Sequence, residues 1–151
     1  MAAAWPGVAA ADPIIGERAP ALAEQKLDDA VVLVDFFATW CEPCHQAMAA
    51  LDAIARRHNV RLVVVDVGEP AATVNAWFVA HPLPPGAQVV LDPQAEGSRR
   101  WGQHRFPTTF VLGGGIIRHI NRGFGSGYAV RLDRWVAGLQ APPSPPPSPS
   151  R

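Results

Sequence analysis

One stretch of the sequence decides the fold: VVLVDFFATWCEPC, which runs from Val31 to Cys44. Its first seven residues are almost all apolar, with β-branched and aromatic types dominant, which predicts a strand buried on both faces. Pro43 stands early in the next segment, where a helix tolerates proline, so a helix is expected to begin at the cysteines. The unpaired N–H groups and the dipole at a helix N-terminus favour a thiolate. The stretch therefore places two thiols where thiol–disulfide exchange is favoured, with the second near enough to resolve a mixed disulfide.

The overall composition fits one ordinary domain and argues against several classes of protein. The chain has 151 residues, of which 48% are hydrophobic, enough for a core of ordinary size. Thirteen acidic and 13 basic residues give zero net charge without a basic stripe, which argues against a nucleic-acid partner. No apolar run in the sequence approaches the length of a membrane span. The two cysteines are the only ones, too few for a disulfide scaffold or a four-ligand zinc site, so no metal is expected.

Outward from this stretch, the hydrophobic patterns predict strands that alternate with helices. The expected elements are a short helix or turn at 21–29, strands at 31–37, 61–67, 88–91, 108–112 and 116–120, and helices that start at the cysteines and at 70–81, 92–101 and 127–139. This order implies a mixed, mostly parallel sheet covered on both faces. We expect a domain over 14–140, a flexible lead-in or leader remnant at 1–13, and a disordered Pro/Ser-rich tail at 141–151.

Three separated parts of the chain resemble the thioredoxin superfamily. They are VDFFATWCEPC at 34–44, FPTTF at 106–110, where the family keeps a cis-proline beside its disulfide, and the closing hairpin with its Gly-rich turn and terminal helix. Pro107 follows Cys41 by 66 positions, which is similar to the TlpA/ResA-like branch of extracytoplasmic reductases. The resemblance implies a thioredoxin-like three-layer α/β/α sandwich with a central mixed sheet and one extra strand–helix insertion. It also favours a periplasmic or membrane-tethered location and leaves the cytoplasm open.

The two cysteines and one aspartate are the candidate catalytic residues. Cys41, at the helix start, is expected to be the attacking nucleophile, and Cys44, one turn further in, is expected to resolve the mixed disulfide. Asp35 interrupts an otherwise apolar strand, where a carboxylate is costly unless it has a partner or a task. By resemblance to thioredoxins it takes and returns the proton of Cys44, and burial would raise its pKa toward neutrality. A structural aspartate bonded to backbone is the alternative.

Residues next to the cysteines and at the second motif are expected to bind the substrate. We interpret Trp40, next to the first cysteine, as a partly exposed rim for substrate docking, with a core aromatic as the alternative. By resemblance, a cis Pro107 places the Phe106 backbone against the disulfide, where it can pair with an extended substrate. Glu42 and Pro43, between the cysteines, are expected to modulate the redox couple.

The sequence predicts a thiol–disulfide oxidoreductase that reduces protein disulfides and needs an upstream partner to recharge its dithiol. No cofactor is implied, and a monomer is expected. Two other interpretations stay open. One is a redox-inert thioredoxin-fold binding or chaperone module that uses the groove at Trp40 and Phe106. The other is a c-type haem protein, because Cys41-Glu-Pro-Cys44-His45 also fits the C-x-x-C-H attachment pattern.

Overall fold

The structure is a computed structural model that describes residues 12–142 and 145–150. Most of the expected lead-in, residues 1–11, lies outside the described residues. The elements in chain order are β1 (Val32–Phe37), α1 (Glu42–His58), β2 (Arg61–Val67), α2 (Ala71–Ala80), β3 (Gln88–Asp92), α3 (Glu96–Arg100), β4 (Thr108–Gly113), β5 (Ile116–Arg122) and α4 (Tyr128–Gln140). This is the predicted order of strands and helices. No helix among the described residues is long and apolar enough to cross a bilayer.

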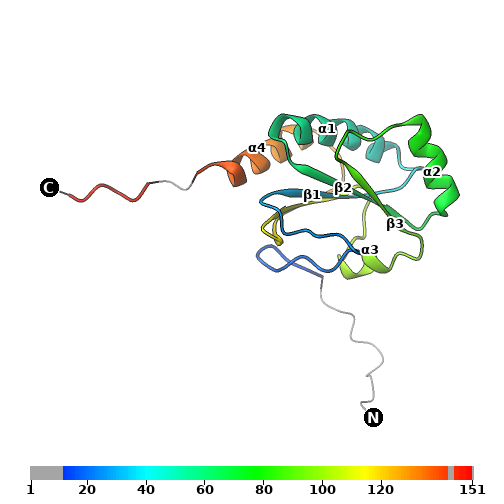
Figure 1. Cartoon of the computed structure of the whole chain (residues 1–151), viewed down its shortest axis with the longest axis horizontal. Coiled ribbons are helices and arrows are strands. Elements are labelled where there is room, and N and C mark those ends of the chain that lie inside the picture. Colours follow the sequence, from blue (N-terminus) through cyan, green and yellow to red (C-terminus); the bar gives the residue numbers. More distant parts are fainter. Residues whose placement is uncertain (1–11, 143–144, 151) are drawn as a thin grey trace, which may run out of the picture.

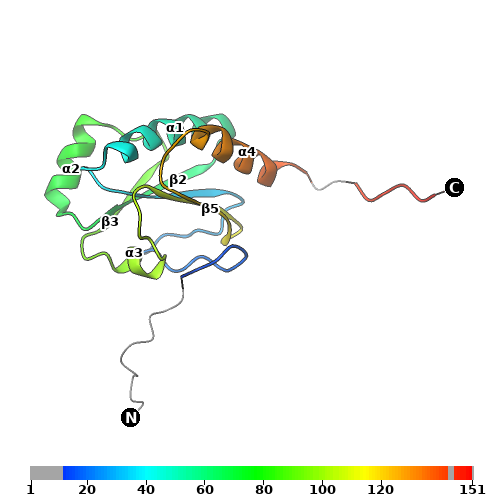
Figure 2. The same cartoon turned by 180° about the vertical axis from the view of Figure 1, so that it is seen from behind.

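The strands form one mixed sheet in the order β3-β2-β1-β4-β5. β1 and β3 both pair with β2 in parallel, whereas β4 runs antiparallel to β1 and to β5. The prediction of a mixed sheet is therefore confirmed. β3 forms the edge of the sheet next to β2, and α3 follows it in the chain. Three layers are visible in Figures 1 and 2: α1 and α4 lie on one side of the sheet and α3 on the other.

The structure decides one open alternative and corrects one predicted helix. The segment 21–29 contains only a turn, in which Ala23 adopts a positive φ of 47°. The helix expected at 92–101 is confined to Glu96–Arg100, because Asp92 still belongs to β3. The Asp92 carboxylate accepts hydrogen bonds from the backbone N–H groups of Gly97 and Ser98, at 3.2 and 2.8 Å, and so satisfies free donors at the start of the short helix.

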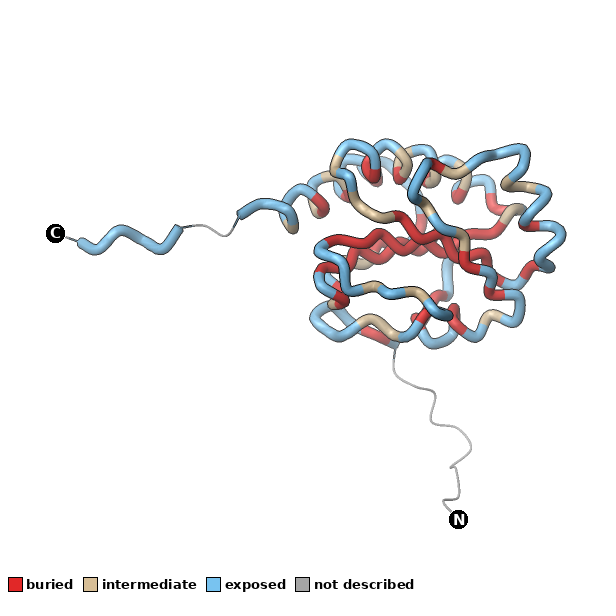
Figure 3. The backbone as a smooth tube through the Cα atoms, in the orientation of Figure 1, coloured by how far each residue is buried: buried red, intermediate tan, exposed pale blue. Residues whose placement is uncertain are grey.

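The central strands β1, β2 and β4 are buried on both faces, and the buried backbone forms a continuous band through the middle of the molecule in Figure 3. Alternate residues of β1 face opposite sides. Leu33 and Phe37 join the core shared with α1 and α4, whereas Phe36 joins the core on the α3 side. On that second side Phe36 packs 5.7 Å from the ring centre of the fully buried Trp101. The apolar run in the sequence is explained by this burial of a central strand.

Hydrogen bonds between polar side chains join the end of α1 to α4. His58 Nε2 lies 2.8 Å from Asp133 Oδ1, and His58 Nδ1 lies 3.1 Å from Gln140 Oε1. Arg57 donates to the same Asp133 oxygen at 2.6 Å. The hydrogen bond from His58, and after it the one from Arg57, lowers the pKa of Asp133. These hydrogen bonds therefore stabilise the ionised carboxylate of Asp133 in the folded state.

Replacing His58 with alanine is expected to lower the free energy of unfolding by about 1–2 kcal/mol, because a charge-assisted hydrogen bond is lost. The pKa of Asp133 is lowered in the folded state. Its contribution is therefore present above the ordinary carboxyl pKa and is lost as the pH falls through the lowered pKa. Denaturant unfolding at pH 7 and pH 3 measures this. As a control, Asp52→Asn breaks only the exposed pair with Arg56 and should change stability by a few tenths of a kcal/mol.

Candidate functional site

The two cysteines lie at the start of α1, directly after β1, as predicted. Cys41 is the residue that caps the helix, and the N–H of Cys44 lies 3.3 Å from the Cys41 sulfur. The two sulfurs form a disulfide. Cys44 is fully buried and Cys41 nearly so. Glu42 and Pro43 occupy the exposed first turn between them, where an acidic side chain and a proline both suit a helix start.

A chain of hydrogen bonds starts at the buried aspartate of β1. The Thr109 hydroxyl donates to Asp35 Oδ1 at 2.8 Å. The Tyr128 hydroxyl lies 2.7 Å from the Thr109 oxygen, and because the Thr109 proton is already used, Tyr128 is the donor there. Asp35 Oδ2 has no hydrogen-bond partner among the described residues. The carboxyl is thus anchored through one oxygen and leaves the other available.

Burial controls the charge of this aspartate. Asp35 is completely buried, and this burial raises its pKa to about 7, although the hydrogen bond from Thr109 acts in the opposite direction. A group with such a pKa can accept and release a proton near neutral pH. The same environment raises the pKa of the Tyr128 hydroxyl, chiefly through burial and then through the nearby Asp35. Tyr128 therefore remains a neutral donor in the chain.

The aromatic residues next to the two motifs meet at the surface. The side chain of Trp40 is exposed, with 68% of its area accessible, and its ring lies 5.3 Å from that of Phe106 in an edge-to-face arrangement. Phe106 also packs against the core that contains both cysteines. The Phe106–Pro107 peptide bond is cis, as predicted, and Pro107 is buried. The two sequence motifs are therefore neighbours in space, with Trp40 exposed as expected.

The sequence did not single out the residues that hold the turn before Cys41. Thr39 donates its backbone N–H and its hydroxyl to the two carboxylate oxygens of Glu69, both at 2.6 Å. The carbonyl of Thr39 accepts a hydrogen bond from His45 Nε2 at 2.8 Å. A glutamate between the apolar strand Arg61–Val67 and Pro70 was the signal in the sequence that could have drawn attention to this region.

The contacts of the His45 ring differ from those of a haem ligand. Its Nε2 donates to Thr39, and its Nδ1 lies 3.3 Å from Glu42 Oε2. The ring stacks on Trp77, with centres 5.0 Å apart. Attachment of c-type haem needs both sulfurs as thioethers and the imidazole as an axial ligand. Because the sulfurs bond each other and His45 binds the turn, the geometry favours the redox interpretation.

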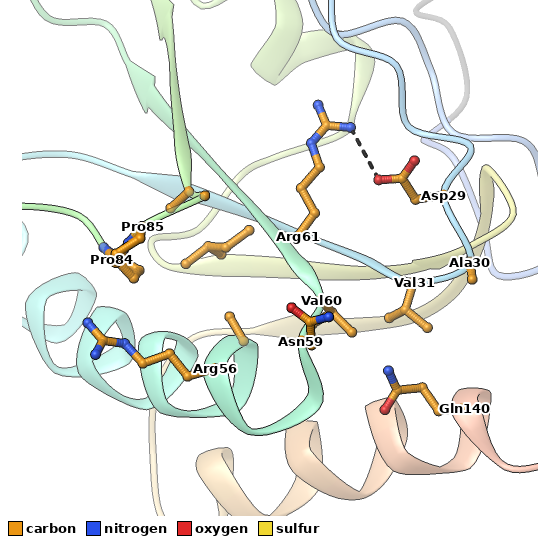
Figure 4. Close-up of a pocket in the computed structure, with 14 residues that line it drawn as sticks. Asp29, Ala30, Val31, Arg56, Asn59, Val60, Arg61, Pro84, Pro85 and Gln140 are labelled. Atoms are coloured by element: carbon orange, nitrogen blue, oxygen red, sulfur yellow. Dashed lines mark ion pairs between the residues drawn. The ribbon is translucent and has the colours of Figure 1, made fainter.

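A cavity of about 700 Å³ lies apart from the cysteines, between the start of β2 and the ends of α1 and α4 (Figure 4). Arg61 is its most prominent charged side chain, and its Nη1 lies 3.7 Å from Asp29 Oδ2. The guanidinium also donates to Gln25, to the Lys26 carbonyl and to Gln88. Arg61 is thus fully engaged in tying the segment before β1 to the sheet, and the cavity contains no part of the chemistry described above.

Comparison with known proteins agrees with this geometry. The family model described as Thioredoxin matches residues 20–83, which include strand β1, the cysteine pair and Glu69. The chain is similar to the thioredoxin family over these residues. Its similarity to curated members includes 33% identity over 90 residues to the thiol:disulfide interchange protein DsbE of Allochromatium vinosum, covering 59% of this chain and 49% of that protein. It also includes 30% identity over 84 residues to the thiol-disulfide oxidoreductase ResA of Geobacillus thermodenitrificans, covering 54% and 47%.

Solved structures show the same fold. StoA from Bacillus subtilis superposes with a TM-score of 0.60 at 23% identity, covering 72% of this chain and 83% of that one. The exposed lipoprotein thioredoxin from Streptococcus pneumoniae gives a TM-score of 0.61 at 18% identity, covering 74% and 86%. The thioredoxin-like sandwich expected from the sequence is therefore confirmed. The chain spans about half the length of the curated relatives DsbE and ResA.

Proposed function

We propose that this protein is a member of the thioredoxin superfamily and a thiol–disulfide oxidoreductase that reduces protein disulfides with the Cys41–Cys44 couple. One observation carries the proposal. A pair of cysteines at a helix N-terminus shares its buried core with Tyr128, which is linked through Thr109 to an aspartate whose pKa is about 7. The printed functions of the relatives DsbE and ResA, thiol:disulfide interchange and thiol-disulfide oxidoreduction, support it.

In the proposed reaction the Cys41 thiolate attacks one sulfur of a substrate disulfide. A mixed disulfide forms and the first substrate thiolate leaves. Cys44 then loses its proton to Asp35 and attacks the Cys41 sulfur, which releases the second substrate thiolate. Two electrons pass to the substrate and the protein is left as the Cys41–Cys44 disulfide. Asp35 later returns the proton when the pair is reduced again.

The neighbouring residues have supporting roles in this proposal. Trp40 and Phe106 offer an apolar surface to the substrate next to the disulfide, and the backbone before Pro107 pairs with an extended segment. Glu42 and Pro43 modulate the couple from the first turn of α1. The N–H of Cys44, which points at the Cys41 sulfur, stabilises the Cys41 thiolate in the reduced protein.

The partners and the location follow from the same proposal. The substrate is a protein with an accessible disulfide, and a separate redox partner returns electrons to the oxidised pair. We propose a monomer that binds no nucleic acid and works outside the cytoplasm. The lipoprotein thioredoxin among the structural neighbours is described as exposed, which supports an extracytoplasmic location.

Reduction of insulin disulfides by dithiothreitol is expected to accelerate in the presence of the protein. Iodoacetamide at pH 7 should alkylate Cys41 of the reduced protein before Cys44, since the first thiol is activated and the second is buried. A reduction potential of about −270 mV would indicate a reductant, and one of about −120 mV would indicate an oxidant. No acceleration together with equal, slow alkylation of both thiols would leave the redox-inert binding module as the better explanation.

A further inference from the structure

A second buried carboxyl group lies at the same end of the sheet as the cysteines. Asp66, near the end of β2, is 1% exposed, and neither of its carboxylate oxygens has a hydrogen-bond partner among the described residues. Its register partner on β1 is Phe37, two residues before Thr39. A buried carboxyl without a partner is costly, and the reaction described above does not use this one. Asp66 therefore calls for an explanation.

Glu69 connects this end of β2 to the active-site turn. It lies three residues after Asp66 and is only 9% exposed. Both of its oxygens accept from Thr39, one from the N–H and one from the hydroxyl. With His45 bound to its carbonyl, every polar group of Thr39 has a partner. Glu69 and His45 thus fix the residue from which the chain enters Trp40 and the cysteine pair.

The turn itself depends on this residue. Cys41 donates its N–H to the carbonyl of Ala38 at 3.1 Å, so Thr39 and Trp40 are the two central residues of a tight turn. Fixing Thr39 therefore fixes the direction in which Trp40 leaves the surface and the position of Cys41 at the helix start. Loss of the Glu69 contacts would leave a buried carboxylate unpaired and release the turn.

The charge of Asp66 depends on its burial and on the neighbouring Glu69. Glu69 accepts two hydrogen bonds from donors, which suits its ionised form. Burial, and then the neighbouring Glu69 carboxyl, raises the pKa of Asp66 to about 8, so Asp66 is neutral at pH 7. Among the other titratable groups, Asp35 lies two residues before Phe37, the register partner of Asp66. His45 binds Thr39, and both His45 and His81 stack on Trp77 of α2. Asp92 of β3 belongs to the opposite face, where it caps α3.

We propose that Glu69 is a positioning residue for disulfide exchange, which clamps the Thr39–Trp40 turn only while Asp66 holds its proton. Ionisation of Asp66 would place a second negative charge beside Glu69 in a buried site, and the repulsion loosens the clamp. The inference rests on the proposed oxidoreductase function for its kinetic consequence. The clamp on Thr39 itself does not depend on that function.

Steady-state reduction of insulin from pH 6 to 9.5 tests the kinetic consequence. Glu69→Gln is expected to lower kcat/KM at pH 7 about tenfold, whereas Glu24→Gln, an exposed control, leaves it unchanged. Exchange with a small aromatic disulfide, which needs no docking at Trp40, should change less than threefold. Asp66→Asn should match wild type at pH 7 and exceed it about tenfold at pH 9, where an Asp66 with a pKa of about 8 is mostly ionised.

Hydrogen exchange of the Thr39 amide in the oxidised protein tests the clamp without any activity. Its protection should fall above pH 8 in wild type, persist in Asp66→Asn, and be absent in Glu69→Gln. If Glu69→Gln does not fold, Thr39→Ala, which loses only the hydroxyl bond, should show an intermediate effect. Equal protection and equal insulin kinetics in wild type and Glu69→Gln would overturn the proposal, as would the same alkaline decline in Asp66→Asn and wild type. A wild type inactive on insulin with the predicted exchange pattern would instead contradict the proposed function alone.

Discussion

Replacing Cys41 with serine is expected to abolish disulfide reduction, whereas replacing Cys44 with serine is expected to trap mixed disulfides. The asymmetry has a structural cause. Cys41 caps α1, where the dipole and the Cys44 N–H stabilise its thiolate, and Cys44 is fully buried one turn further in. Without Cys41 no nucleophile attacks the substrate. Without Cys44 the attack still occurs, but nothing displaces the product.

Insulin reduction and non-reducing gel electrophoresis with a disulfide-containing substrate measure the two effects. Cys41→Ser should bring the rate down to that of dithiothreitol alone and give no covalent complex. Cys44→Ser should give a complex that dithiothreitol releases. The double variant is the matched control, because it loses both sulfurs and is expected to keep the fold. Trapping by Cys41→Ser instead of Cys44→Ser would reverse the two roles.

Replacing Asp35 with asparagine is expected to slow insulin reduction at pH 7 on the order of 10²-fold, the usual effect of losing a general base. The asparagine still accepts the hydrogen bond from Thr109 but cannot take the Cys44 proton. Thr109→Val provides a milder comparison. Removing its hydrogen bond should raise the pKa of Asp35 further and shift the pH–rate profile to higher pH. Kinetics of Asp35→Asn that match wild type from pH 6 to 9 would remove Asp35 from the mechanism.

The same substitution should stabilise the protein. Asp35 has a folded-state pKa of about 7, above the ordinary value of 3.8, so the folded protein keeps a proton that the unfolded chain releases. Its contribution to stability is fully present below the ordinary pKa and is lost as the pH rises toward 7, a change of about 4 kcal/mol. Asp35→Asn should therefore gain more stability over wild type at pH 8 than at pH 4. Asp28→Asn, at an exposed position, should show no such difference.

Asp35 and Asp66 are buried acids with different expected tasks. Asp35 keeps one oxygen without a partner among the described residues and is linked through Thr109 to Tyr128 of the core that contains the cysteines, which suits proton exchange. Asp66 neighbours a second carboxyl group that is already committed to the backbone of the active-site turn. The first acid would act on the reaction and the second on the position of Cys41. The activity of Asp35→Asn and the pH profile of Asp66→Asn separate these tasks.

The sequence by itself determined strand β1, the start of helix α1 at the cysteines, and the order of the elements. Each of these depends on neighbouring residues: the unbroken apolar run of β1, the proline in the first helical turn, and periodicities of two or 3.6 residues. The same local signals placed Trp40 at the rim. They failed for the start of α3, where the chain is held by a turn and by the Asp92 cap.

Only the tertiary structure decided which side chains surround the cysteines. Asp35 meets Thr109 across 74 positions because β1 and β4 pair with these two residues in register. Thr39 meets Glu69 across 30 positions because parallel β1 and β2 end side by side. The pKa values of Asp35 and Asp66 depend in turn on burial that these pairings create. Strand register and desolvation arise from contacts between distant parts of the chain, and no local pattern in the sequence encodes them.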